Sequence, residues 1–309
     1  MAEQDFTQLQ GWAGRRVADK AWETIGSELP KFFIAGQVAS TEGKTLRAWD
    51  LSRKVLAGKD MKRTIQQAPD CVGMSTIDMA MYKQLADIAM GQRKIFKPLL
   101  CSYVYATSRV LIGNNQLKGS GGSVGSWMAK AIQKYGFLAD DFADSPEYSG
   151  KLSDYWGDDK LYNNVSFRKF IDEGDNHLGV PGARITSWTQ LRDGIINAHF
   201  GTIASNRGYA MKPDSEGYHR PSGSWSHQMS ILALCDDPKN SWVALGNQWG
   251  DVHGLLKDFQ TGEEWPRGML RVKRDDFERK HLTNGAECFL YPSIDGFQDN
   301  SEDLEGMLF

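Results

Sequence analysis

The chain has 309 residues, of which 40% are hydrophobic and ten are tryptophan, so it can form a substantial core in one large domain or two smaller ones. Its formal net charge is only −3 and no run of lysine and arginine stands out, which argues against nucleic-acid binding. The sequence has no run of about 18 apolar residues, and its start lacks the basic and apolar regions of a signal peptide, so we expect neither a membrane span nor secretion by that route.

The first half of the chain predicts mainly helices. Residues 1–60 mix short helical patterns with loops and are expected to form an N-terminal extension. A nearly unbroken apolar pattern then predicts a buried helix from Cys71 to about Met90. Two further helices are expected over about 99–111 and about 127–135, with a glycine-rich loop between them.

The second half of the chain predicts mainly strands. Residues 139–180 are polar, aromatic and turn-rich, and they show little periodicity, whereas 189–196 predicts a short helix. Five strands separated by Gly, Pro, Asn and Asp are then expected at 199–205, 227–235, 241–247, 268–273 and 286–291.

This segregation of helices from strands indicates an α+β fold with two lobes that meet at a cleft. The helical lobe is expected at about 61–138 and the β-rich lobe at about 180–296, within one domain of residues 61–296. The acid-rich end, residues 297–309, is expected to be a solvated tail.

Cys71 is the candidate nucleophile because it stands at the first turn of the predicted helix. A helix N-terminus and a neighbouring imidazolium both lower the pKa of a thiol, and the thiolate is the reactive form. An isolated cysteine is more often an inert, buried side chain. Here, however, Gln66 and Gln67 come shortly before Cys71, and either amide could stabilise an oxyanion together with the backbone N–H of Cys71.

His227 and Asn247 are the candidate partners of that thiol. His227 opens one predicted strand and Asn247 closes the next, which places an imidazole beside a side-chain amide. Asn247 would then orient the ring, and Trp249 would shield their hydrogen bond from water. A structural histidine and an ordinary core tryptophan are the simpler alternative, but a base oriented by a third group is two-thirds of a nucleophilic triad, and we favour that interpretation.

The glycine-rich loop at residues 119–125 has two possible explanations. Such loops can bind phosphate, but no Gly-Lys-Ser or Gly-Lys-Thr follows this one. We favour the other explanation, in which Gly121 and Gly122 form a cleft wall that a peptide backbone can approach closely.

The remaining side chains give little indication of a metal site or a cofactor. The histidines other than His227 have no paired ligand spacing, and the cysteines are scattered and too few for a disulfide framework. We therefore expect no metal and no cofactor, and a reducing compartment fits the cysteine content best. The four cysteines are Cys71, Cys101, Cys235 and Cys288.

The order of these motifs over roughly residues 60–292 resembles that of the papain-like cysteine peptidases. Gln66 or Gln67 before Cys71 is similar to the oxyanion glutamine and nucleophile of that family, and Ser120-Gly121-Gly122 resembles its substrate-binding wall. His227 resembles its base, and Asn247-Gln248-Trp249-Gly250 resembles its Asn-Ser-Trp-Gly motif. The short sequences around Cys71 and His227 look most like those of divergent bacterial and phage-encoded members.

The sequence also departs from the family pattern in two places. Val72 stands where most members have tryptophan, and the glutamines lie five and four residues before Cys71 rather than six.

The resemblance implies a papain-like fold and hydrolysis of peptide bonds through a thioester, with a peptide or protein as substrate. The alternative is a structural or assembly protein of a phage particle, which keeps the fold, binds other virion proteins and has lost or incidental activity. A cytoplasmic or virion-associated location is expected in either case.

Overall fold

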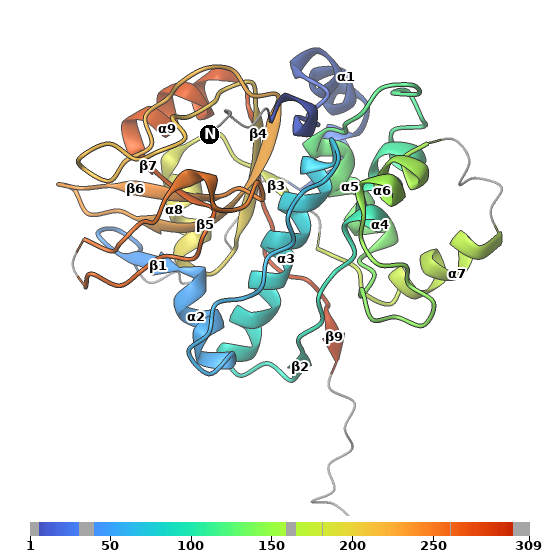
Figure 1. Ribbon diagram of the computed structural model, residues 1–309, viewed down its shortest axis with the longest axis horizontal. Helices are drawn as coiled ribbons and strands as arrows, with labels where there is room; N and C mark the ends of the chain where they lie inside the picture. The colour runs from blue at the N-terminus through green and yellow to red at the C-terminus, as the bar shows by residue number, and fades with distance from the viewer. Residues whose placement is uncertain (1–5, 31–39, 159–164, 181, 260, 299–309) are drawn as a thin grey trace, which may run out of the picture.

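Helix α3 (Cys71–Ala89) lies at the centre of the molecule, between a helical lobe and a β-rich lobe (Figure 1). The computed structural model describes residues 6–30, 40–158, 165–180, 182–259 and 261–298. All but the last two residues of α3 are buried, including its polar ones, because elements of both lobes pack around it. A helix with partners on every side needs no polar face, which explains the nearly continuous apolar pattern.

The helical lobe is built from short helices on one side of α3. They are α4 (Cys101–Ala106), α5 (Gly125–Tyr135), α6 (Gly150–Trp156) and α7 (Val165–Gly174), and a π-helical turn over Thr107–Ile112 continues α4. The helices expected near 99–111 and 127–135 are thus present.

Helices α6 and α7 correct the sequence analysis, which predicted no element between residues 139 and 180. Their aromatic side chains form a small cluster, in which the ring of Trp156 lies 5.1 Å from that of Phe167 and 5.4 Å from that of Phe170. The helices are too short to show a clear period in the sequence, so packing between them, rather than local propensity, accounts for their formation.

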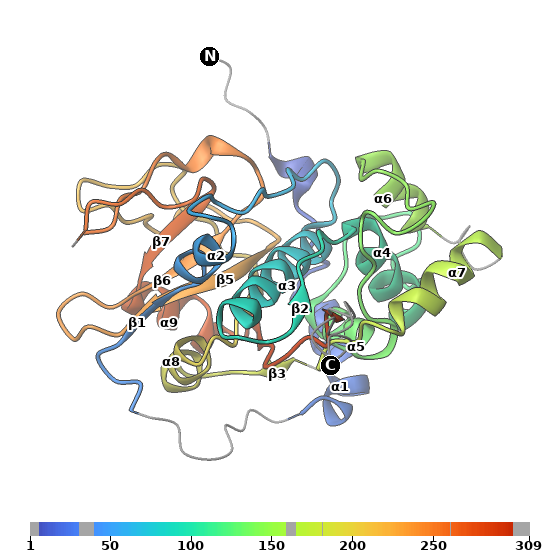
Figure 2. The ribbon, with the colours of Figure 1, turned by 90° about the horizontal axis from the view of Figure 1, so that it is seen from below.

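The β-rich lobe holds an antiparallel sheet of seven strands within the described residues. Its order is β3-β8-β4-β5-β6-β7, and β1 pairs with the C-terminal end of β5. The strands are β1 (Thr45–Arg47), β3 (Ala183–Arg184), β4 (Gly201–Ser205), β5 (His227–Cys235), β6 (Trp242–Gly246), β7 (Met269–Lys273) and β8 (Glu287–Leu290). The helices α8 (Trp188–Ile196) and α9 (Arg274–Lys280) belong to the same lobe, as Figure 2 shows from a second direction.

Parts of the predicted extension and tail belong to the folded domain. Strand β1 adds to the sheet, and α2 (Ala48–Val55) packs on α3 and buries Trp49. At the other end, β9 (Phe297–Gln298) pairs with β2 (Lys94–Ile95), so residues 297 and 298 are not tail. The tail predicted beyond them, residues 299–309, lies outside the described residues.

Helix α1 (Arg15–Ile25) packs on α5, and four 3₁₀ helices complete the described elements. The 3₁₀ helices are Thr7–Leu9, Gly26–Glu28, Asp251–His253 and Leu282–Asn284. None of the described helices is long and apolar enough to span a membrane. All four cysteines are free and buried.

Candidate active site

Cys71 begins α3 at the junction of the two lobes and is completely buried. The backbone N–H of Gln228, the residue after His227, donates to its Sγ atom over 3.4 Å. Burial raises the pKa of the Cys71 thiol to about 12, although contacts with backbone N–H groups of Gln228 and Gly11 oppose that rise. The lowered pKa expected from the sequence is therefore wrong for this closed arrangement, in which water is excluded from the sulfur.

His227 and Asn247 lie side by side at the ends of β5 and β6. The Nε2 atom of His227 is 3.0 Å from Oδ1 of Asn247, and because an amide oxygen only accepts, Nε2 carries the proton and donates. Burial lowers the pKa of His227 to about 4, so the ring is neutral near pH 7. Its other nitrogen, Nδ1, is buried without a hydrogen-bond partner and is free to accept a proton.

A second histidine extends this network, and the sequence analysis did not identify it. The Nδ2–H of Asn247 donates to Nε2 of His253 over 2.8 Å, so both polar atoms of the Asn247 amide are used. Burial lowers the pKa of His253 to about 3, which keeps it neutral and able to accept this bond. His253 lies only six residues after Asn247, but a single histidine in a turn gives no sequence signal that separates this role from others.

Gln66 and Trp249 form the next layer around the site. The Nε1–H of Trp249 donates to Oε1 of Gln66 over 3.1 Å, and the Trp249 ring lies 4.5 Å from the ring of His227. The amide nitrogen of Gln66 donates to the carbonyl oxygens of Leu9 and Ala68, each over 2.7 Å. Of the two glutamines left open by the sequence, Gln66 is thus the buried one that already binds backbone carbonyl oxygens.

Gly121 and Gly122 lie in the loop before α5, close to Pro69 and Gly11, and Arg109 holds this loop in place. A side chain on Gly121 would collide with Pro69, because its Cβ would lie 2.4 Å from the proline ring. The buried Arg109 guanidinium donates to the Gly122 carbonyl oxygen over 2.6 Å, while the N–H of Gly122 donates to the hydroxyl of Tyr105. Both backbone groups of Gly122 are thus bound within the protein, and the binding of a peptide along this loop stays a prediction.

A stretch of the chain itself, residues 6–13, covers the site; it contains the 3₁₀ helix Thr7–Leu9, and we call it the N-terminal segment. Its residues Gly11 and Ala13 bond to both backbone groups of Ser123, with N···O distances of 2.8 Å. The N–H of Trp12 donates to the carbonyl oxygen of Ser226, directly before His227, over 3.0 Å. The segment therefore runs along the glycine-rich loop and past the thiol of Cys71, which has no exposed surface.

Aromatic stacking and close backbone contact complete this closure. Phe6 stacks on Trp249 with ring centroids 4.8 Å apart and planes 5° from parallel. Gly11 needs to be glycine, because a Cβ there would lie 1.9 Å from the carbonyl oxygen of Pro69. Likewise, a Cβ on Gly122 would lie 2.5 Å from the Gly11 carbonyl oxygen. The sequence could not show this contact, since it joins residues more than a hundred positions apart.

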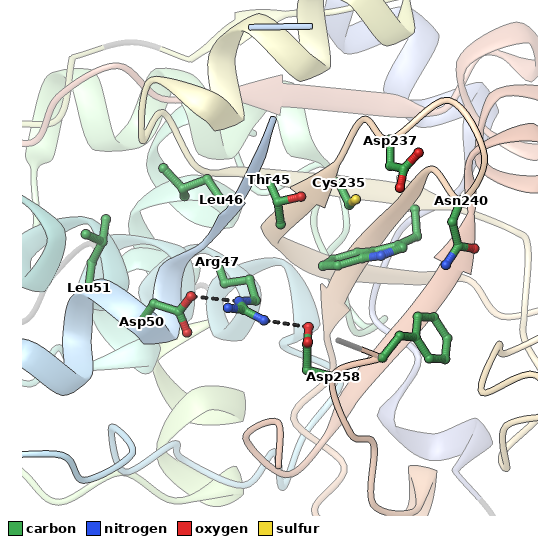
Figure 3. Close-up of a pocket in the computed structure, with 11 residues that line it drawn as sticks. Thr45, Leu46, Arg47, Asp50, Leu51, Cys235, Asp237, Asn240 and Asp258 are labelled. Atoms are coloured by element: carbon green, nitrogen blue, oxygen red, sulfur yellow. Dashed lines mark hydrogen bonds and ion pairs between the residues drawn. The ribbon is translucent and has the colours of Figure 1, made fainter. Parts of the chain in front are cut away.

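A separate hollow of about 320 Å³ lies at the opposite end of β5, around Cys235 (Figure 3). Arg47 crosses it and donates to Asp50 and Asp258. Its lining residues include a cysteine but no histidine, so they do not form a nucleophile with its base. Elsewhere in the described part of the chain, no group of three His, Cys, Asp or Glu residues is arranged to hold a metal ion.

The sequence matches no protein-family model, and no curated protein matches it significantly. Solved structures do match. Xylellain, a cysteine protease from Xylella fastidiosa, is 10% identical with a TM-score of 0.54, and the match covers 95% of this chain and 99% of that one.

Two other matches are digestive procathepsin L 3 from Tenebrio molitor and procathepsin B S9 from Trypanosoma congolense. The first is 11% identical with a TM-score of 0.53 over 92% of this chain and 77% of that one. The second is 9% identical with a TM-score of 0.55 over 93% and 87%. The predicted papain-like, two-lobed fold is thereby confirmed.

Proposed function

We propose that this protein is a cysteine endopeptidase that hydrolyses peptide bonds through a thioester on Cys71. The observation that carries the proposal is the neutral His227, which donates from Nε2 to Asn247 and keeps Nδ1 unprotonated in the same buried site as Cys71. A thiol, a free imidazole nitrogen and an amide that orients the ring are the parts that this chemistry needs.

In the proposed reaction, His227 accepts the thiol proton while the sulfur of Cys71 attacks the substrate carbonyl carbon. The amide of Gln66 and the backbone N–H of Cys71 stabilise the oxyanion that forms. The C–N bond then breaks, and His227 gives the proton to the leaving amine. A water molecule, deprotonated by His227, attacks the thioester and releases the acid and the thiol.

Gln66 is favoured over Gln67 for the oxyanion role. Its Nε2–H already donates to the carbonyl oxygen of Leu9, which belongs to the N-terminal segment lying over the site. Gln67 is exposed, and its side chain instead accepts a hydrogen bond from the N–H of Gly150. A substrate carbonyl that replaces that of Leu9 would meet the same donor.

The N-terminal segment has to leave before a substrate can enter. Gly11→Val in the full-length chain should force this, because its Cβ cannot coexist with the Pro69 carbonyl oxygen 1.9 Å away. We call this protein the opened variant.

The proposal is tested by incubating the wild type and the opened variant with a broad peptide library and identifying products by mass spectrometry. We expect cleavage that is faster in the opened variant and absent when Cys71→Ser is added. A folded opened variant that cleaves no peptide would contradict the proposal. Neither the described contacts nor the reported neighbours favour the alternative role in phage assembly.

A further inference from the structure

Glu287, at the start of β8, is a buried acid beneath the N-terminal segment. Its Oε2 accepts from the indole Nε1–H of Trp12 over 2.7 Å and from the N–H of Gly125 over 3.0 Å. Its Oε1 accepts from the N–H of Ser126 over 2.9 Å. The two backbone donors come from the start of α5 and fix the carboxylate, so that the indole is its one replaceable partner among these three.

The indole of Trp12 fills an apolar pocket around this carboxylate. Trp12 clusters with Val124, Trp127 and Ala204, and Ala204 is the cross-strand partner of Glu287. The pocket adjoins the backbone of Ser123, which binds the residues on both sides of Trp12. Any extended chain that pairs with Ser123 in this way would place a side chain in the same pocket.

The pocket can outlast the departure of the N-terminal segment, because Ala18 and Ala21 of α1 belong to the same cluster and α1 has anchors of its own. Trp22 in α1 packs on Phe289 with ring centroids 6.1 Å apart, and the Arg184 guanidinium lies 4.7 Å from the centroid of the Trp22 ring. Gly14, with a φ of 87°, separates the segment from α1 and provides a pivot.

We propose that Glu287 is the specificity-determining residue of this cleft and selects a substrate with tryptophan in the pocket. The inference rests on the proposed peptidase function. A phenylalanine or leucine there would bury the carboxylate without its third donor, and sites with such unpaired groups discriminate strongly. A guanidinium would leave several of its five N–H donors facing apolar walls.

The test uses the full-length Gly11→Val/Trp12→Ala protein, whose pocket is emptied, and a synthetic peptide with the sequence of residues 6–13. Isothermal titration compares this peptide with an analogue in which benzothienylalanine replaces tryptophan. That ring has the same shape but a sulfur in place of the N–H. We expect the analogue to bind roughly 10- to 100-fold more weakly.

Adding Glu287→Gln should reduce this preference to less than about threefold, because the carboxylate acceptor is lost. The matched control, Glu264→Gln at an exposed position, should preserve it. Equal binding of the two peptides, binding of neither, or a preference that survives Glu287→Gln would overturn the inference.

Cleavage by the opened variant separates this inference from the proposed function. The test uses fluorogenic peptides that carry tryptophan, phenylalanine or arginine at the pocket position. The tryptophan peptide should be cleaved about tenfold or more faster than either of the other two. A preference for arginine would overturn the inference. If the binding preference is found but no peptide is cleaved, the role of Glu287 as a selector of indole stands and the peptidase proposal fails.

Discussion

The N-terminal segment and the three residues beneath it, Cys71, His227 and Asn247, are built in opposite ways. We call these three residues the floor of the site. Cys71 and His227 are the first residues of α3 and β5, and Asn247 directly follows β6; all three elements are buried along all or most of their length. Of the eight residues in the segment, only Gly11 and Trp12 are buried, and few backbone bonds hold it. The geometry of the proposed catalytic residues therefore belongs to the buried core, whereas access to Cys71 depends on a segment of which most residues are at least partly exposed.

The largest expected effect concerns the floor. In the opened variant, His227→Ala should reduce the peptide cleavage rate on the order of 10⁴-fold, because His227 moves the proton in every step. Asn247→Ala should cost only about 10- to 10³-fold, since Asn247 orients the ring. Cleavage rates are measured with circular dichroism as a control for folding. An Asn247→Ala protein with unchanged activity would show that another residue orients His227. Asp251 does not fit that role, because its carboxylate pairs with Arg267 at the surface.

The second prediction compares the stability of the folded protein at two pH values, because its buried histidines are held neutral. Burial lowers the pKa of His227 to about 4 and that of His253 and His281 to about 3, all from 6.5. Each of these histidines binds a proton more tightly in the unfolded chain than in the folded protein. The free energy of unfolding therefore falls as the pH drops below about 6.5, by up to about 1.4 kcal/mol per pH unit for each histidine. Asp70 opposes this, because burial raises its pKa to about 6 and its protonation stabilises the folded state.

The histidines outnumber the acid, so the unfolding free energy should fall by roughly 2 to 5 kcal/mol between about pH 7 and pH 5. Urea denaturation at the two pH values measures it. An equal or greater stability at pH 5 would show that the three rings are not held neutral by burial.

The third prediction compares two neighbouring glutamines. Gln66→Ala in the opened variant should lower kcat on the order of 10²-fold, because an oxyanion donor is removed. Gln67→Ala is the matched control and should leave kcat within about twofold. The reverse ranking would assign the oxyanion role to Gln67.

The sequence allowed the floor to be predicted far better than the segment. Cys71 at a helix start and His227 at a strand start are local signals, because the apolar pattern reveals the element and the polar residue marks its end. The path of residues 6–13 depends on contacts with Ser123 and Ser226, which no local pattern reports. For the same reason, the sequence indicated neither the bond from Asn247 to His253 nor the pairing of β1 with β5.

The smallest expected effect concerns the segment itself. Gly11→Val should raise the cleavage rate about tenfold over wild type, which corresponds to a shift of about 1.4 kcal/mol in the opening equilibrium. The Gly11→Val/Cys71→Ser protein supplies the background rate. A rate at or below that of the wild type in a folded variant would mean that the segment does not limit access.

The most direct test of the central claim is to label Cys71 with a peptide-mimicking vinyl sulfone and to map the product by mass spectrometry. We predict slow labelling of Cys71 in the wild type, faster labelling in the opened variant, and loss of that gain when His227→Ala is added. The other three cysteines, all buried, should stay unlabelled in each protein. If Cys71 reacts equally in the wild type and the opened variant, or if His227→Ala leaves its rate unchanged, a closed Cys71–His227 site is the wrong account of this molecule.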